Sequence, residues 1–184
     1  MRIVAGLARG RRLAGPADGT RPTSDRAREG LFNSLAATMR LDGARMLDLF
    51  AGTGAVGLEA LSRGASAAVF VESNRRAVEV LRRNVATVGL PGAEVVAAPV
   101  SRYLSEPPEA PFDLVFADPP YALPETEVDG VLAALSGEGW LAPDAYVVVE
   151  RSSRTGPVGW AADRITPVRE KRYGEALLWY GRRR

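Results

Sequence analysis

The sequence predicts an α/β protein with a mostly parallel sheet covered by helices on both faces. Short, almost wholly apolar segments alternate with amphipathic segments of helical period through most of the chain. The last two apolar segments are instead joined by a short turn, which predicts an antiparallel hairpin at the edge of the sheet. At 184 residues, the chain has the size of one domain, or of one domain with a short extension.

The expected elements follow this alternation in order. Strands are predicted over 46–50, 67–72, 94–97, 112–117 and 145–150. Helices are predicted over 24–39, 55–63, 75–88, 101–104 and 125–135, the first of them capped by Thr23 or Ser24. The edge hairpin is predicted from segments 165–171 and 176–180, joined around Gly174.

Residues 1–22 are predicted to form a separate basic arm, with residues 23–184 as the main domain. Segments 2–5 and 12–14 of the arm resemble two short strands around a stretch that contains glycine.

Charge is divided unevenly along the chain. Residues 1–28 contain seven basic and two acidic side chains, as do residues 164–184, so each end carries +5. The part between them contains ten basic and eighteen acidic side chains, for a net charge of −8. A chain that is basic at both ends predicts a polyanionic partner bound by those ends. The alternative is a solvated tail combined with biased codon usage, because 23 of the 24 basic residues are arginine.

Two residue types are absent, and their absence excludes several kinds of chemistry. Without cysteine there is no disulfide, thiolate metal site, iron–sulfur cluster or cysteine nucleophile. Without histidine there is no Ser-His-Asp triad and almost no route to a zinc site, so no metal is expected. No apolar run approaches the roughly 18 residues that span a bilayer, and arginines interrupt the first twelve residues. The sequence therefore predicts a cytoplasmic protein.

The segment 48–57 has the pattern of a nucleotide-binding turn. Its glycines match G-x-G-x-x-G, it lies between a predicted strand and a predicted helix, and Glu72 follows Gly52 by twenty residues at the end of the next strand. Two cofactor classes compete for this pattern: a dinucleotide such as NAD or FAD, and S-adenosylmethionine. Asp48 favours the second, because its carboxylate would repel a pyrophosphate but pair with the ammonium of a methionine moiety. The alternative is a purely structural turn, in which Asp48 acts as a local cap.

The tetrapeptide Asp118-Pro119-Pro120-Tyr121 follows the fourth strand directly, at the sheet edge where ligands of such folds bind. The prolines have no N–H, so the backbone here offers only acceptors, to which Asp118 adds a carboxylate. Tyr121 offers a flat face for stacking a base. Such a pocket suits a planar substrate with an exocyclic amine, which Asp118 and the Pro119 carbonyl would hold pyramidal and ready to attack a sulfonium methyl. The alternative is a plain Pro-Pro turn.

With these motifs in place, the chain resembles the RsmD family. The resemblance extends over nearly the whole chain and rests on segments 2–6, 21–23, 28–33, 48–65 and 118–121. It implies a Rossmann-like, seven-stranded S-adenosylmethionine-dependent methyltransferase fold. It also implies methylation of the N2 amine of one guanine in 16S ribosomal RNA, within an assembling small subunit. The donor site that it implies consists of Asp48, Phe50, Ala51, Gly52, Gly54, Glu72, Ser73 and Asp118, with the residues from Asp118 to Tyr121 at the target base.

One segment departs from the usual pattern of such enzymes. Residues 97–100 read Ala-Ala-Pro-Val, without the Asp or Asn that commonly holds the adenine amine after the third strand. Adenine binding at this point would have to use backbone groups.

The basic arm and the first helix complete the predicted site. Thr23 is expected near the methionine end of the donor, with the helix 24–39 covering it. The protein is expected to act as a monomer. The arginines predicted to contact RNA phosphates are Arg2, Arg9, Arg11, Arg12, Arg21 and Arg26.

Three other functions remain open from the sequence. One is another amine methylase, acting on DNA adenine or cytosine or on protein glutamine. The others are a nicotinamide-dependent oxidoreductase and an RNA-binding module without enzymatic activity.

Overall fold

The computed structural model describes residues 1–16, 23–160 and 163–184, and within them seven strands form one sheet in the order β3-β2-β1-β4-β5-β7-β6. The strands are β1 (Arg45–Leu49), β2 (Ala67–Glu72), β3 (Ala93–Ala97), β4 (Phe112–Ala117), β5 (Leu141–Ser152), β6 (Ile165–Tyr173) and β7 (Ala176–Arg183). The helices are α1 (Asp25–Ala36), α2 (Ala55–Ser62), α3 (Arg75–Val88), α4 (Val100–Tyr103) and α5 (Glu125–Leu135). Strands β1 to β5 pair in parallel, and β7 is antiparallel to both β5 and β6. The predicted fold class is therefore confirmed.

The largest difference from the expected elements lies at the edge of the sheet. Strand β5 begins four residues earlier than predicted, and β6 and β7 extend the hairpin beyond the apolar residues. The added residues include Pro143 and Asp144 of β5, whose residue types are rare in strands, and Arg182 and Arg183 of β7. Pairing of β7 with β5 and β6 holds the two arginines in the strand. Asp144 lies where the pairing of β4 with β5 is irregular, and it forms an ion pair with Arg182.

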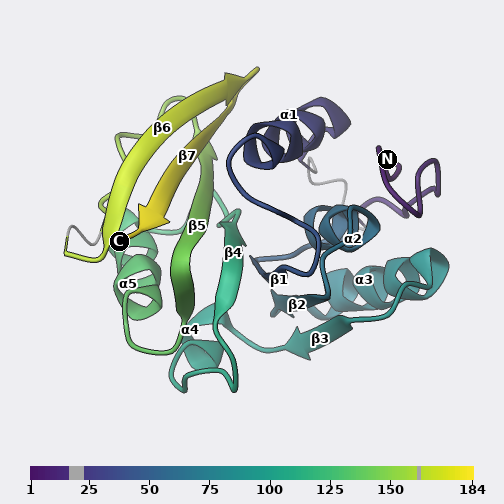
Figure 1. The fold of residues 1–184 in the computed structure, drawn as a ribbon, viewed down its shortest axis with the longest axis horizontal. Helices are drawn as coiled ribbons and strands as arrows, with labels where there is room; N and C mark the ends of the chain where they lie inside the picture. Colours follow the sequence, from purple (N-terminus) through teal and green to yellow (C-terminus); the bar gives the residue numbers. More distant parts are fainter. Residues whose placement is uncertain (17–22, 161–162) are drawn as a thin grey trace.

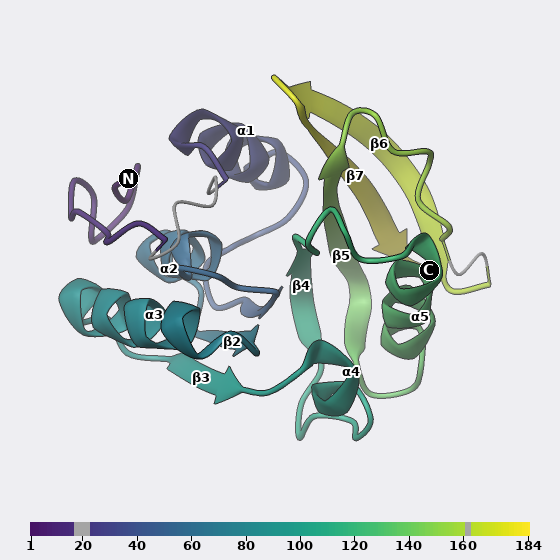
Figure 2. The same cartoon turned by 180° about the vertical axis from the view of Figure 1, so that it is seen from behind.

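Each face of the sheet buries its own apolar cluster. Helices α1, α2 and α3 cover one face, where Phe70 and Phe116 lie in the cluster, and α4 and α5 cover the other, where Leu47 and Val115 lie. Successive side chains of β1, β2 and β4 alternate between the two clusters, as the period of a strand requires. Figures 1 and 2 show the two layers of helices from opposite sides.

The described part of the arm, residues 1–16, packs against the main domain. An antiparallel bridge joins Arg2 to Arg12, which closes the expected hairpin. Ile3, Ala8 and Leu13 are buried in the same cluster as α1 and α2. Removal of this segment would therefore expose part of the core.

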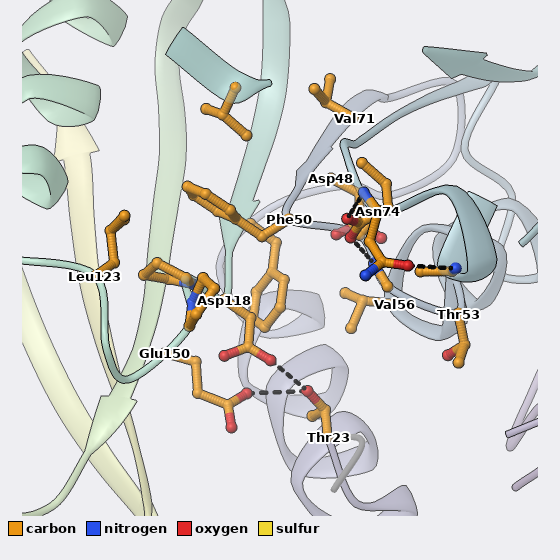
Figure 3. Close-up of a pocket in the computed structure, with 18 of the residues that line it drawn as sticks. Thr23, Asp48, Phe50, Thr53, Val56, Val71, Asn74, Asp118, Leu123 and Glu150 are labelled. Carbon is orange, nitrogen blue, oxygen red and sulfur yellow. Dashed lines mark hydrogen bonds between the residues drawn. The ribbon is translucent and has the colours of Figure 1, made fainter. Parts of the chain in front are cut away.

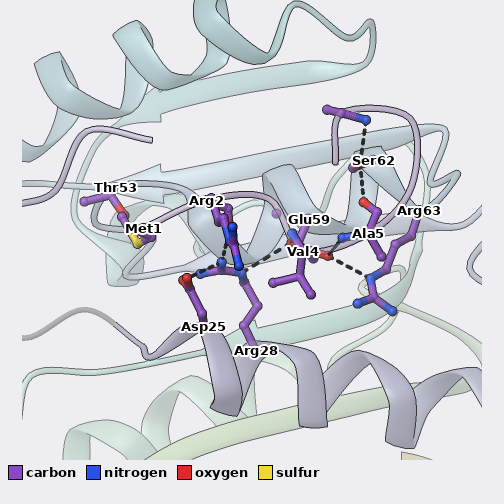
Figure 4. Close-up of polar contacts among 12 residues, drawn as sticks. Met1, Arg2, Val4, Ala5, Asp25, Arg28, Thr53, Glu59, Ser62 and Arg63 are labelled. Carbon is purple, nitrogen blue, oxygen red and sulfur yellow. Dashed lines mark hydrogen bonds and ion pairs between the residues drawn. The ribbon is translucent and has the colours of Figure 1, made fainter. Parts of the chain in front are cut away.

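A buried ionic network fastens the arm to two helices (Figure 4). The Glu59 carboxylate of α2 accepts hydrogen bonds from the backbone N–H groups of Val4, at 2.9 Å, and Ala5, at 3.0 Å. The guanidinium of Arg28, on α1, is completely buried and donates to Glu59, to Asp25 and to the Arg2 carbonyl oxygen. Segments far apart in sequence are thus held together by the buried side chains of Arg28 and Glu59.

Candidate active site

A cavity of about 1220 Å³ lies beyond the carboxyl ends of β1, β2, β4 and β5. Ligands of open α/β sheets bind at this edge, where the connections to the helices diverge. The cavity brings together most of the predicted site residues (Figure 3). Those that line it are Asp48, Phe50, Ala51, Gly52, Glu72, Ser73, Asp118, Pro119, Pro120 and Tyr121.

The turn between β1 and α2 is shaped by backbone in the left-handed region. Phe50 has a φ of 58°, although it is not glycine, and such local strain is typical of functional sites. Gly52 has a φ of 56°, and a Cβ built on it would meet no atom within 4 Å. Gly52 therefore faces open space that a ligand can approach closely. Gly54, predicted in the same set, lies outside the cavity lining, and a Cβ there would strike the side chain of Leu81.

Asp48 lies at the base of this turn and is only 1% exposed. Its Oδ2 accepts a hydrogen bond of 3.0 Å from the N–H of Gly57, in the first turns of α2. Burial and, to a smaller extent, the charge of Glu72 raise the pKa of Asp48 to about 8, against the lowering effect of this hydrogen bond. A cationic ligand group beside Asp48 would favour the charged carboxylate.

Glu72 joins two loops of the cavity through hydrogen bonds. Its carboxylate accepts 2.8 Å hydrogen bonds from the backbone N–H groups of Gly52, after β1, and Asn74, after β2. Each carboxylate oxygen can accept a further bond, so the group remains able to bind ribose hydroxyls.

The carboxyls of Asp118 and Glu150 meet at one hydroxyl group (Figure 3). Thr23 Oγ1 lies 3.4 Å from Asp118 Oδ2 and 3.1 Å from Glu150 Oε2. Burial, followed by the charges of Glu150 and Asp48, raises the pKa of Asp118 well above its ordinary value, while Thr23 and Arg151 lower it. Burial also raises the pKa of Glu150. The part of the cavity around Asp118, Pro119 and Glu150, here called the mouth, is therefore acidic, although Arg151 lies close enough to lower the pKa of Asp118.

The three residues after Asp118 differ in exposure. Pro119 is buried and Pro120 is exposed, while Tyr121 is 63% exposed at the cavity rim. An exposed aromatic ring beside a cavity can stack on an incoming base.

The cavity also includes residues that the sequence patterns did not single out. Glu150 comes from β5, and residues 173–176 form the turn between β6 and β7, predicted only as an edge hairpin. One sequence feature could have identified Glu150: like Glu72, it lies near the carboxyl end of a predicted parallel strand. The segment after β3, which is predicted to lie beside the adenine, lines the cavity with Pro99, Val100 and Ser101. This wall is largely apolar and has no acidic side chain.

The predicted RNA contacts lie mainly on the arm. Arg2, Arg9, Arg11 and Arg12 are exposed, although Arg11 also donates a hydrogen bond to the Val88 carbonyl oxygen. Arg26 is exposed on α1 and lines the cavity. Arg21 lies outside the described residues.

Neither a metal-binding cluster nor a membrane-spanning helix occurs in the described part of the chain. In residues 1–16, 23–160 and 163–184, no group of acidic side chains has the geometry of a metal site. Within the same ranges, every helix is too short or too polar to cross a membrane.

The sheet order, the glycine turn and the acidic strand ends together define the fold of S-adenosylmethionine-dependent methyltransferases. The solved structure of SMU.776, a putative methyltransferase complexed with SAH, shares this fold with a TM-score of 0.70 at 15% identity, covering 85% of this chain and 48% of that one. The chain belongs to the family described as "Conserved hypothetical protein 95", whose profile matches residues 1–182, and this match confirms the resemblance to the RsmD family.

Several relatives within this family are similar over most of the chain. "Ribosomal RNA small subunit methyltransferase D" of Escherichia coli strain K12 is 40% identical over 169 residues, which are 89% of this chain and 83% of the relative. "Putative rRNA methyltransferase YlbH" of Bacillus subtilis is 36% identical over 154 residues, covering 82% of each chain. The solved "Putative methyltransferase yhhF from Escherichia coli" superposes with a TM-score of 0.87 at 36% identity, over 100% of this chain and 97% of that one.

Proposed function

We propose that the protein transfers a methyl group from S-adenosylmethionine to the exocyclic N2 amine of a guanine in 16S ribosomal RNA. The observation that carries the proposal is the junction of two features in one cavity: a glycine turn with a buried carboxylate, and a mouth whose side chains and backbone chiefly accept hydrogen bonds. The names of the family relatives support ribosomal RNA as the substrate.

The residues of the cavity fit S-adenosylmethionine in three respects. Asp48 lies where a carboxylate would pair with the ammonium group, and Gly52 leaves open space for close approach. Glu72 is held by two backbone N–H groups and keeps free lone pairs for the ribose hydroxyls. When bound, this donor supplies an electrophilic methyl group on a sulfonium.

The mouth acts on the amine of the target base. The lone pair of N2 is delocalised into the purine ring, so hydrogen bonds accepted by Asp118 and the Pro119 carbonyl favour a pyramidal, more nucleophilic nitrogen. The proton that N2 loses can pass to Asp118, because a carboxyl of raised pKa is a better base than an ordinary one. Stacking on Tyr121 would hold the ring, contributing roughly 1–3 kcal/mol.

The exposed arginines of the arm supply the contact with RNA. Phosphate contacts from this surface would set the position of the RNA, while the mouth reads the base. A stacked guanine must leave its stack to enter the cavity, at a cost of a few kcal/mol. Partly assembled subunits, in which RNA is already held in position, should then react faster than naked RNA.

The test is methyl transfer from labelled S-adenosylmethionine to small subunits that lack the modification, followed by mass mapping of the product. The expected product is one N2-methylguanine in 16S RNA. A label found in DNA or protein instead would indicate another amine methylase. Calorimetry gives an independent check, since tight binding of NADH rather than S-adenosylhomocysteine would favour an oxidoreductase. Equal rates on naked RNA and on subunits would contradict the preference for particles.

A further inference from the structure

Glu150 is a buried carboxyl for which the methyl-transfer scheme has no task. It is 5% exposed, near the carboxyl end of β5, one residue beyond the pairing of Val149 with Ala117. It therefore lies beside Asp118, which follows Ala117 on the neighbouring strand. Among the residues that the structure describes, Thr23 is its hydrogen-bonding partner, and that hydroxyl also contacts Asp118. Burial of a carboxyl with so few donors is unfavourable unless a ligand supplies them.

Guanine presents three adjacent N–H donors, one on N1 and two on N2. Asp118 and the Pro119 carbonyl can accept the two bonds from N2. The N1–H then requires a third acceptor on the same side of the mouth. Glu150 shares a hydroxyl contact with Asp118, so it is the acidic side chain next in line along the sheet edge.

We propose that Glu150 accepts the N1–H of the target guanine and is a specificity-determining residue of this site. The proposal rests on the proposed function, because it concerns the base whose N2 is methylated. Glu150 would distinguish guanine from a base that has the same amine but no proton on N1. In such a base, N1 directs a lone pair toward the carboxylate.

The electrostatics of the mouth agree with this role. The charge of Glu150 raises the pKa of Asp118, and burial raises the pKa of both carboxyls. Among the described residues, the Thr23 hydroxyl is the donor that both carboxyls contact. Guanine brings three donors and allows both carboxyls to ionise. A base with an acceptor at N1 brings two donors and a repulsive contact. Sites that hydrogen-bond a substrate N–H reject analogues lacking it strongly, and we expect a preference of about 10²–10⁴-fold.

The test compares guanine with 2-aminopurine at the mapped target nucleotide of reconstituted small subunits. 2-Aminopurine keeps the exocyclic amine, but its N1 carries a lone pair in place of the proton. The wild-type protein should prefer guanine, measured as the ratio of kcat/KM values. Glu150→Gln should reduce that ratio at least about tenfold, because a side-chain amide can donate to N1. Comparing this ratio between the wild type and the variant cancels the difference in intrinsic reactivity between the two amines.

Three controls keep the result specific. Glu138→Gln, an exposed change in the loop before β5, should leave the ratio unchanged. S-adenosylhomocysteine affinity should be the same in the wild type and in Glu150→Gln. If Glu150→Gln does not fold, Glu150→Asp replaces it: a carboxylate withdrawn by one methylene should lower kcat/KM for guanine more than for 2-aminopurine.

The outcomes separate this inference from the proposed function. A wild-type product other than N2-methylguanine overturns the proposed function and the inference with it. N2-methylguanine formed without discrimination against 2-aminopurine overturns the inference alone. Equal loss of activity on both substrates in Glu150→Gln also overturns it, because that is the result expected of a purely structural residue.

Discussion

Two groups of buried ionisable side chains lie on the α1 face of the sheet, and they are organised in opposite ways. Around Glu59, every contact brings a donor to an acceptor: Val4 and Ala5 donate backbone N–H groups, and Arg63 donates from Nε at 2.9 Å. Arg28 completes the network from α1. Such complementary groups hold segments together, because loss of one group removes a partner from another that stays buried.

Around Asp118, the arrangement is reversed. Asp48, Asp118 and Glu150 bring carboxyls together, and one threonine hydroxyl serves two of them. Arg151 lowers the pKa of Asp118, but burial and the two carboxyls raise it by more. Electrostatic strain of this kind is relieved by a ligand that supplies cations and N–H donors. Buried charge thus stabilises the fold in one place and, under the proposed function, prepares a binding site in the other.

The largest expected effect is on activity, at the carboxyls of the mouth. Asp118→Asn replaces one carboxylate oxygen, a hydrogen-bond acceptor, by an NH₂ group. It also removes the base that would take the proton from N2, so kcat should fall about 10³-fold. Stability should change in the opposite direction. The pKa of Asp118 is higher in the folded protein than in the unfolded chain, so the contribution of this carboxyl to stability is fully present only below the pKa of the unfolded chain. That contribution is lost as the pH rises through the pKa of the folded protein.

Methyl transfer and thermal unfolding between pH 5 and pH 8 check this prediction. The melting temperature of Asp118→Asn should equal or exceed that of the wild type, with a difference that grows toward pH 8. S-adenosylhomocysteine binding should be retained. A variant that is less stable at pH 8 would mean that Asp118 supports the fold as Glu59 does.

The paired network should show the second largest effect, on stability. Arg28→Met leaves the buried Glu59 carboxylate without one cation, and we expect a loss of about 3–5 kcal/mol in the free energy of unfolding. Urea unfolding measures it. Arg40→Met is the matched control, because the ion pair of Arg40 with Asp42 is 87% and 79% exposed and should contribute almost nothing. Similar losses in both variants would remove the distinction between the two groups.

Donor affinity should depend on pH through Asp48. Since the pKa of Asp48 is about 8 in the free protein, its carboxyl must lose a proton to pair with an ammonium group. The affinity for S-adenosylhomocysteine should fall by about 50-fold as the pH is lowered from 8 to 6, because about half of the Asp48 carboxyls are ionised at pH 8 and about one in a hundred at pH 6. Calorimetry at several pH values measures it. Asp48→Asn should bind weakly and with little pH dependence, whereas an unchanged pH profile in this variant would exclude Asp48 as the titrating group.

The smallest expected effect concerns the arm. Arg9→Ala combined with Arg12→Ala should weaken RNA binding and reduce the slope of log affinity against log salt by about 0.7–0.9 for each phosphate that the variant no longer neutralises. Substitution is preferable to truncation, because Ile3 and Leu13 of the arm belong to the core. Arg102→Ala, on α4 across the sheet, is the control. An unchanged slope in the double variant would show that the arm does not contact phosphates.

Particular residues show how far sequence reasoning reaches. Strand β2 and helices α3 and α5 end where their patterns predict, because apolar periodicity and capping are local properties. Asp48, Gly52, Glu72 and Asp118 could be placed in one cavity because the carboxyl ends of parallel strands share an edge. Gly54 could not be distinguished from Gly52 by pattern, and only packing against Leu81 separates them.

The sequence by itself determined the alternation of elements, the glycine turn and the acceptor-only segment after β4, because each depends on neighbours within a few residues. Only the tertiary structure decided that Glu150 and Thr23 join Asp118, that the β6–β7 turn reaches the cavity, and that the arm is fastened through Glu59. These interactions join residues that lie far apart along the chain. Their energies depend on burial and on the sign of neighbouring charges, which no local pattern contains.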